Sequence, residues 1–589
     1  MLSFLKYVLA TIVGLFLFMV LGFFVMVGIG ALFSKSDTTV IEENTVLRLD
    51  LERPILEVVE EDPISEALAP FTGEIPSVGI KDLRDALKKA SADGKIKGIY
   101  LKSGDPASGW AVLEEVRDAL SEFKKSGKFI YAYSEGYSEK GYYLASVADA
   151  IYLSEFGDFE WNGLSVEYDF YKGTLDKLEI RPEVFRVGEF KSAVEPFLRS
   201  DMSEPSRKQA SEMIGGINGH FLKQVSAARG ISVDLLKGWA DSLSIEKAAD
   251  ALQRKLVTNV GYYDEFEDDI KGKIGIEKDK KIKFVGVKKY LSSTSAGEEG
   301  DYNKRIAVVI ADGEIVGAGA SGDGVITAEN LIKQLRKVRE NDKVKAVVLR
   351  INSPGGSALA SDLIWREVKL TAGKKPLIAS MGNVAASGGY YIAMAADTIV
   401  AQPNTITGSI GIFGLMLNIE PFMKNKLGIT FDRVTTNPHS DWPTATRSMT
   451  DFEKQKIQSS VEHGYDVFTA KAAQGRKMSQ DELKKFAEGR VWSGIDAKQH
   501  NLVDVLGGLD QAITLAAGAA GLKEGEYRVR YFPESKDWRE ELISSLTGSD
   551  DEEALSKVLG PLAPYAKAYQ RLQRMEGIQA RLPFEMRIN

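Results

Sequence analysis

The stretch Met381-Gly-Asn-Val-Ala-Ala-Ser387-Gly-Gly-Tyr-Tyr-Ile-Ala393 places a serine in a turn of small residues in the C-terminal half of the chain. The N-terminal half contains a diverged copy of this stretch, Tyr133-Ser-Glu-Gly-Tyr-Ser-Glu139-Lys-Gly-Tyr-Tyr-Leu-Ala145. Aligning the two Gly-Tyr-Tyr runs sets Glu139 opposite Ser387 (387 − 248 = 139). The pattern predicts a duplicated fold in which only one copy keeps the serine.

Short β-branched and aromatic runs alternate with helical patterns in both halves, which predicts an α/β fold with parallel sheets. Strands are expected at 46–51, 99–101, 129–132 and 150–153, and again at 305–310, 346–351, 377–380 and 398–401. The repeat continues beyond the serine, where 184–187 falls opposite 431–434 and 201–203 opposite 448–450 (449 − 202 = 247). Two copies of this length indicate gene duplication and not a solenoid.

The 589 residues are enough for two or three domains. We expect an N-terminal segment 1–33, a first domain 34–300, a second domain 301–525 and a tail 526–589, with a linker-like stretch at 290–303. A net charge of −8 and a pI near 5.5 argue against nucleic-acid binding. The absence of cysteine excludes disulfides, thiolate metal sites and cysteine nucleophiles.

The N-terminal segment is predicted to be a membrane anchor. No charged residue lies between Lys6 and Lys35 (35 − 6 − 1 = 28 positions), and Tyr7 to Phe33 is almost wholly apolar. About 20 such residues span a bilayer as a helix, and the apolar core of a cleavable signal is shorter. An uncleaved anchor is therefore expected, with the large C-terminal portion outside the cytoplasm.

Ser387 is a candidate nucleophile. At the start of a helix it would meet free backbone N–H groups and the positive end of the helix dipole, which favour a developing oxyanion. The structural alternative is that Ser387 only caps a buried helix. A second glycine loop, Asn352-Ser-Pro-Gly-Gly356, follows an expected strand. N–H groups of Gly388 and Gly356 would form an oxyanion hole; a phosphate nest is the rival interpretation, weakened because no Walker lysine follows.

A serine nucleophile needs a base. None of the four histidines, at positions 220, 439, 463 and 500, stands in a context that marks it as this base, and Asp397 has a counterpart in Asp149 of the other copy. A lysine serves if burial depresses its pKa. Lys191 is flanked by apolar residues, and Pro438 stands at the aligned place in the other half (191 + 247 = 438). One half thus has the serine and the other the lysine.

The chain resembles signal peptide peptidase A (protease IV) in its double-length Gram-negative form, from the N-terminal anchor to about Gly521. The resemblance rests on Lys191-Ser-Ala-Val-Glu-Pro-Phe197, Asn352-Ser-Pro-Gly-Gly356, Ala385-Ala-Ser-Gly-Gly389 and Thr407-Gly-Ser-Ile-Gly411. It implies two tandem ClpP/crotonase-like domains and a Ser–Lys dyad. Ser387 would be the nucleophile and Lys191 the general base, with Ser409 orienting the lysine. No metal or other cofactor is implied.

The resemblance also implies a membrane-anchored serine endopeptidase that degrades hydrophobic peptides such as cleaved signal peptides. It would be a homotetramer in the bacterial inner membrane, single-pass, with its catalytic domains on the periplasmic side. The stretch 406–417 is expected to pair with an extended substrate. The sequence leaves two alternatives, a crotonase-like acyl-CoA enzyme and a catalytically inactive membrane scaffold. It also leaves open whether one chain supplies both members of the dyad.

Overall fold

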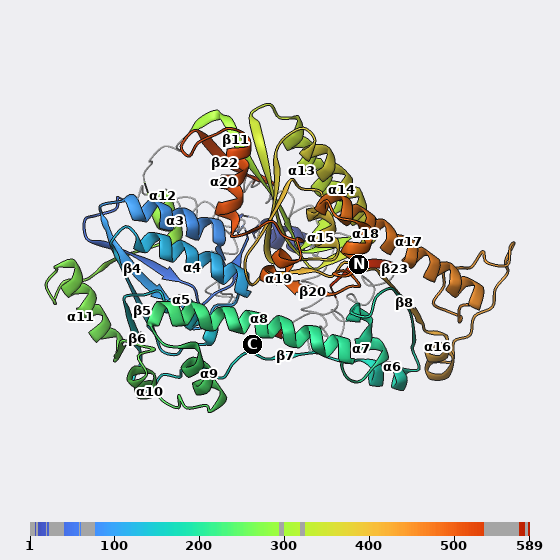
Figure 1. Ribbon diagram of the computed structural model, residues 1–589, viewed down its shortest axis with the longest axis horizontal. Helices are drawn as coiled ribbons and strands as arrows, with labels where there is room; N and C mark the ends of the chain where they lie inside the picture. The colour runs from blue at the N-terminus through green and yellow to red at the C-terminus, as the bar shows by residue number, and fades with distance from the viewer. Residues whose placement is uncertain are drawn as a thin grey trace.

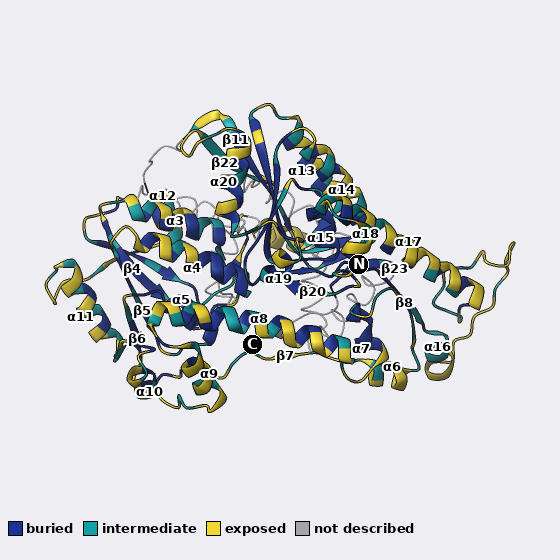
Figure 2. Cartoon of the chain, viewed as in Figure 1, coloured by how far each residue is buried: buried dark blue, intermediate teal, exposed yellow. Residues whose placement is uncertain are grey.

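The computed structural model describes residues 6–7, 10–18, 21–22, 40–57, 59, 77–293, 300–317, 324–534, 577–582 and 587–588. Two parallel sheets form the centre of the molecule, one from each half of the chain, and helices cover them (Figure 1). The α/β class expected from the sequence is confirmed. The inner strands of these sheets are mostly dark blue in Figure 2 because their side chains make up the buried cores.

The first sheet has six parallel strands. Their order is β10 (Lys283–Gly286), β1 (Thr45–Asp50), β4 (Ile96–Lys102), β5 (Phe129–Ser134), β6 (Ala150–Leu153) and β9 (Asn259–Val260). The apolar runs expected to be strands lie within or overlap these elements, because such runs are buried on both faces of a parallel sheet.

The second sheet repeats this order. Its corresponding strands are β22 (Tyr527–Phe532), β11 (Asp301–Asp312), β14 (Val344–Ser353), β16 (Leu377–Ala386), β17 (Thr398–Ala401) and β21 (Val505–Leu506). Two further strands, β18 (Ile406–Gly408) and β20 (Val491–Ser493), extend it alongside the end of β16. The shared order is independent evidence for the duplication. Strand β22 lies within the segment that we assigned to the tail.

The helices cover the two sheets and the surface between them (Figure 1). In the first half they are α3 (Ile80–Ala92), α4 (Trp110–Lys124), α5 (Glu139–Ala145), α6 (Lys172–Leu178), α7 (Glu195–Leu198), α8 (Glu204–Arg229), α9 (Val233–Asp241), α10 (Ala248–Gln253), α11 (Tyr263–Ile274) and α12 (Val287–Ser292). In the second half they are α13 (Ala328–Glu340), α14 (Ala358–Ala372), α15 (Gly388–Ala393), α16 (Glu420–Leu427), α17 (Asp451–Arg476), α18 (Gln480–Lys484), α19 (Gly494–Gln499) and α20 (Leu509–Ala519).

A third sheet joins segments that are distant in the sequence. Its order is β13 (Val325–Thr327), β12 (Glu314–Val316), β15 (Gly355–Ser357), β23 (Gly577–Arg581), β19 (Phe413–Asn418) and β8 (Arg181–Arg186). Strand β8 comes from the first half and pairs antiparallel with β19 of the second. The pairs β2 (Ile55–Leu56) with β3 (Val78–Gly79) and β24 (Arg587–Ile588) with β7 (Val166–Glu167) are separate.

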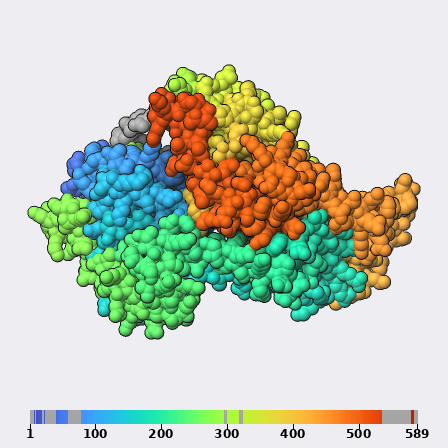
Figure 3. All heavy atoms as spheres, viewed as in Figure 1, coloured from blue at the N-terminus to red at the C-terminus, as the bar shows by residue number. Residues whose placement is uncertain are grey.

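The two halves of the chain share buried surface. The fully buried guanidinium of Arg350 on β14 pairs with Glu57 and Glu115 of the first half, with N–O distances of 2.8 and 2.7 Å. Ala386 and Val491 belong to the apolar core of the first half. Helix α8 crosses beneath both halves and lies directly against the second in the space-filling view (Figure 3). Residues that flank β16 are therefore held by both halves.

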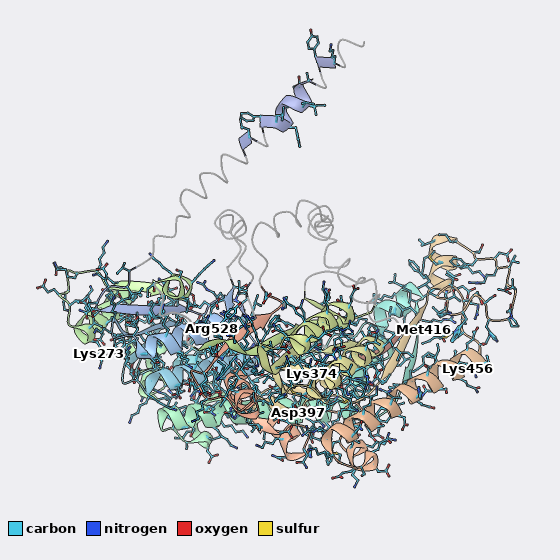
Figure 4. The ribbon with its side chains drawn as sticks, turned by 90° about the horizontal axis from the view of Figure 1, so that it is seen from above. Lys273, Lys374, Asp397, Met416, Lys456 and Arg528 are labelled. Carbon is cyan, nitrogen blue, oxygen red and sulfur yellow. The ribbon has the colours of Figure 1, made fainter. Side chains whose placement is uncertain are left out.

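The described residues of the apolar N-terminal stretch are helical and stand apart from the sheets (Figure 4). In the same view, Met416 of β19 and Lys456 of α17 lie at one end of the body, opposite Lys273 of α11. Within the parts of the chain that the structure describes, no helix has the length and apolarity needed to cross a membrane. Most of the predicted anchor, 1–33, lies outside those parts.

Candidate active site

Ser387 occupies the sharp turn between β16 and α15. Strand β16 continues to Ala386, beyond the end expected at 380, so that the serine follows the strand directly. Its backbone has φ 53° and ψ −110°, a conformation that non-glycine residues rarely adopt and that the surrounding structure must enforce. Its side chain makes no capping hydrogen bond with α15. The capping alternative is therefore wrong, and the hydroxyl donates instead to the Gly411 carbonyl oxygen at 3.4 Å.

Lys191 reaches Ser387 from the other half of the same chain. It lies after β8 at the start of a 3₁₀ turn, Ser192–Val194, and its side chain is fully buried. Its Nζ is 3.0 Å from Ser387 Oγ. Because β8 is hydrogen bonded to β19, the loop that carries Lys191 is fixed to the half that carries the serine. A single chain can thus place the two predicted dyad members within hydrogen-bonding distance.

Burial lowers the pKa of Lys191 well below its ordinary value of 10.5, because desolvation disfavours the ammonium form. The acceptors that described residues offer to Nζ are hydroxyl and carbonyl oxygens, with no carboxylate among them. A carboxylate in contact would hold the proton on the amine. The surroundings therefore favour the neutral amine, which is the form that can accept a proton.

Ser409 and two glycines lie against the lysine side chain. Nζ donates to Ser409 Oγ at 3.0 Å and contacts the Ser409 carbonyl oxygen at 3.3 Å. A Cβ added to Gly489 would lie 2.7 Å from the Lys191 Cβ, and one added to Gly411 would lie 3.2 Å from its Cδ. Any larger residue at Gly489 would displace the lysine stem. Gly411 belongs to a motif that the sequence singled out, whereas no pattern in the sequence marks Gly489.

The glycine loops meet beside the serine. A Cβ added to Gly355 would lie 2.6 Å from the backbone nitrogen of Gly388, so only glycine allows this approach. Gly355 also has φ 95°, in the region that favours glycine. Gly356 packs against the carbonyl oxygen of Ile315 and forms part of β15. The predicted oxyanion residues Gly388 and Gly356 thus flank the serine on one side, with Gly355 between them.

The remaining candidate bases take structural positions. His439 contacts Glu453, with Nδ1 and Oε1 3.0 Å apart, and His220 contacts Glu114. The Asp397 carboxylate accepts the backbone N–H of Leu377 at 2.8 Å. Its counterpart Asp149 accepts the equivalent N–H in the first half at 2.9 Å. The same bond in both copies gives Asp397 a role in the fold, as its occurrence in both copies had indicated.

Glu139, the counterpart of Ser387 in the first half, is buried and hydrogen bonds the backbone. The Glu139 carboxylate accepts backbone N–H groups of Asn162 and Gly163 at 3.1 and 2.8 Å. Burial raises its pKa to about 7, although these two bonds favour ionisation. A carboxylate held in this way leaves no hydroxyl to attack a substrate. The first half therefore keeps the turn but not the serine.

Comparisons with known proteins agree with this site. The family described as Peptidase family S49 matches the chain twice, at residues 122–276 and 369–523. The chain belongs to peptidase family S49. A second family, described as Clp protease, matches residues 303–407, which include the serine turn. The repeated match agrees with the two sheets of like order, and the protein is a serine protease with two tandem S49 repeats.

Three relatives cover much of the chain. Protease 4 of Haemophilus influenzae is 37% identical over 86% of this chain and 85% of its own length. Protease 4 of Salmonella typhi is 37% identical over 80% of this chain and 76% of its own. The chloroplastic serine protease SPPA of Arabidopsis thaliana is 36% identical over 76% of this chain and 66% of its own.

Residues of the C-terminal tail enter the site, which we did not expect from the sequence. The carbonyl oxygen of Arg581 accepts a hydrogen bond from Lys191 Nζ at 2.5 Å. Strand β23 pairs with β15 on one side and β19 on the other. The tail, to which the sequence analysis gave no role, therefore supplies an acceptor to Lys191. The run 577–582 is short and lacks a strong β pattern, so its pairing depends on strands that are remote in sequence.

Proposed function

We propose that this chain is an endopeptidase in which Lys191 activates Ser387. The neutral amine takes the hydroxyl proton, and Ser387 Oγ attacks the carbonyl carbon of a peptide bond. The tetrahedral oxyanion receives N–H groups from Gly388 and Gly356. Lys191 then gives its proton to the leaving amine. It next accepts a proton from the water that hydrolyses the serine ester.

The 3.0 Å contact between Lys191 Nζ and Ser387 Oγ is the observation that carries this proposal. Ser409 supports it by holding Nζ toward the serine, as the resemblance implied. A fluorophosphonate probe that labels active serines tests the assignment, together with hydrolysis of an apolar peptide ester. We expect labelling and hydrolysis in the wild type and neither in Ser387→Ala. Equal labelling of both proteins would rule out Ser387 as the nucleophile.

Membrane anchoring is the second part of the proposal. The apolar stretch Tyr7 to Phe33 is long enough for one span. Its described residues expose large apolar side chains, such as Phe16 at 61% and Phe18 at 73%. The enzyme would be single-pass in the bacterial inner membrane, with its catalytic domains in the periplasm and remnants of signal peptides as substrates. Extraction by alkaline carbonate, which leaves integral proteins in the membrane, tests this; release of the full chain would contradict it.

A homotetramer is the third part, and the pairing of β8 with β19 supports it. At an offset of 247 (434 − 187), the counterpart of 181–187 in the second half is 428–434. That segment forms no strand, and Val434 is fully exposed. The same offset places the first-half counterpart of β19 at a segment that begins with β7. Pairing of 428–434 with the β7 region of a neighbouring chain would repeat the internal contact around a closed ring.

Light scattering on the detergent-solubilised protein tests the assembly. We expect a tetramer for the wild type and smaller species for Val434→Asp, because the charge would be buried in the contact. Lys477→Asp, at an exposed position away from that segment, is the matched control and should leave the mass unchanged. A wild-type monomer would contradict the tetramer.

A further inference from the structure

The strand β23 occupies the place that an extended substrate would take. It runs antiparallel to β15, which carries the oxyanion glycines, with Gly355 opposite Arg581 and Gly356 opposite Ala580. On its other side it pairs with β19, with Phe413 opposite Gln579. Strand addition of this kind is a general mode of peptide recognition, in which main-chain bonds hold the peptide and side chains fill alternate pockets. The chain thus presents a hexapeptide, 577–582, to its own site.

The register of β23 identifies the bond that faces the nucleophile. The Ala580 carbonyl oxygen lies against the glycines, since a Cβ added to Gly355 or Gly388 would be 2.2 or 2.9 Å from it. Leu582 N donates to the Pro354 carbonyl at 2.6 Å, and the two-residue alternation of an antiparallel ladder makes Ala580 and Gly356 the next hydrogen-bonding pair. The Ala580 carbonyl therefore stands where the oxyanion forms.

Lys191 lies on the opposite edge of the same strand. Its Nζ contacts the Arg581 carbonyl oxygen at 2.5 Å, and in an extended strand the N–H of a residue points to the same side as its carbonyl. The amine that would leave on cleavage of the Ala580–Arg581 bond thus belongs to Arg581, beside the group that must protonate it. Arg581 occupies the position that directly follows the bond to be cut.

The side chain at that position meets a carboxylate. Arg581 Nη1 is 2.6 Å from Glu314 Oε1, and the two side chains are 10% and 13% exposed. Glu314 belongs to β12, the neighbour of β15 in the same sheet, so its position is fixed relative to the oxyanion glycines. A charge-assisted hydrogen bond that is largely shielded from water discriminates strongly between a cationic side chain and a neutral one.

We propose that Glu314 is a specificity residue, which selects peptides with a cationic side chain directly after the bond that is cut. The segment 577–582 is one such peptide, supplied by the chain itself. This inference rests on the peptidase chemistry proposed above. It defines the preferred substrate more closely. Such a substrate is an extended peptide with a small residue before the bond that is cut, as Ala580 is, and arginine or lysine after it.

The test compares two blocked peptides in the full-length protein, Gly-Ile-Gln-Ala-Arg-Leu and Gly-Ile-Gln-Ala-Leu-Leu. We expect cleavage after alanine, with kcat/KM for the arginine peptide higher by about tenfold, the size expected for one charge-assisted hydrogen bond. Competition from the chain's own strand affects both peptides equally, so it cancels in this ratio.

Variants of Glu314 decide the origin of the preference. In Glu314→Gln the ratio should fall to about one, and Glu314→Lys should prefer a peptide with glutamate after alanine. Asp312→Asn is the matched control: it removes a nearby carboxylate that bonds Asn352 instead, and it should keep the wild-type ratio. A ratio unchanged in Glu314→Gln, or cleavage at another bond, overturns the inference. If the wild type hydrolyses the peptide ester and Ser387→Ala does not, the proposed function stands whatever the peptide ratio. If neither the peptides nor the ester are hydrolysed, both proposals fail.

Discussion

The two copies of the fold use the same turn for different purposes. In the second half Ser387 meets a buried lysine, whereas in the first half Glu139 accepts two backbone N–H groups. In both halves the strands follow the same order and a helix follows the turn. In both, an aspartate after that helix accepts a backbone N–H from the strand before the turn. The difference shows that this fold tolerates replacement of the serine by a side chain that satisfies nearby backbone groups.

The largest effect should come from the serine turn of the second half. Ser387→Ala is expected to lower kcat by about 10⁴-fold or more, because the oxyanion donors alone cannot replace a nucleophile. The equivalent change in the first half, Glu139→Gln, should leave kcat within about twofold of the wild type. Peptide-ester hydrolysis measures both. A large loss in Glu139→Gln would contradict the division between the two turns.

Lys191→Met should lower kcat/KM nearly as much, about 10³-fold, since no other base contacts the serine among the described residues. In the wild type kcat/KM should rise with pH as Lys191 loses its proton. The rise should reach its plateau below pH 10.5, because burial lowers the pKa. Lys140→Met, in the turn of the first half, is the control and should retain this profile. A flat wild-type profile would argue against a lysine base.

The same substitution should stabilise the fold at pH 7. The pKa of Lys191 is lower in the folded state than in the unfolded state, because burial disfavours the ammonium form, so the unfolded chain binds the proton more tightly. That proton favours unfolding, and its effect fades as pH rises toward 10.5. Met lacks this penalty and fills a similar volume. Urea unfolding at pH 7 and 10 measures the difference; a Lys191→Met protein less stable than wild type at pH 7 would contradict it.

Occupancy of the groove by β23 should raise the KM for external peptides. Ala580 is fully buried, so Ala580→Trp should prevent the strand from seating and lower KM by about tenfold, because a tethered ligand competes at a high effective concentration. kcat should not change. Ala580→Gly fits the same space and is the control. Equal KM values in the wild type and Ala580→Trp would show that the strand does not compete.

The smallest effect concerns Glu139. Its pKa is raised from 4.5 to about 7 on folding, so its contribution to stability is complete below pH 4.5 and is lost as pH rises through 7. Glu139→Gln should remove this loss, which is about 3 kcal/mol. Thermal melting between pH 4.5 and 8 measures it. A variant with the same pH dependence as the wild type would assign that dependence to other groups.

Much of this architecture was predictable because the duplication supplied an internal alignment. That alignment set Glu139 opposite Ser387 and left Lys191 without a partner lysine, which indicated the dyad. It could not indicate Gly489 or Glu314, because their importance comes from contacts between strands that lie far apart in sequence. Strand β8 illustrates the same limit. Its counterpart at 431–434 has a similar sequence but forms no strand, because β7, where the counterpart of β19 begins, pairs with β24 instead.

The division of the dyad between two halves also sets the order in which activity can arise. The surroundings that keep Lys191 neutral include Ser409, Gly411 and Gly489, all of which are synthesised after it. Until these residues have folded around the lysine, water reaches its amine, which then stays protonated at neutral pH. If Lys191 is the base, as proposed above, a partly made chain would lack it. The proposed activity would then arise only when synthesis and folding are nearly complete, which would protect the emerging chain from its own protease.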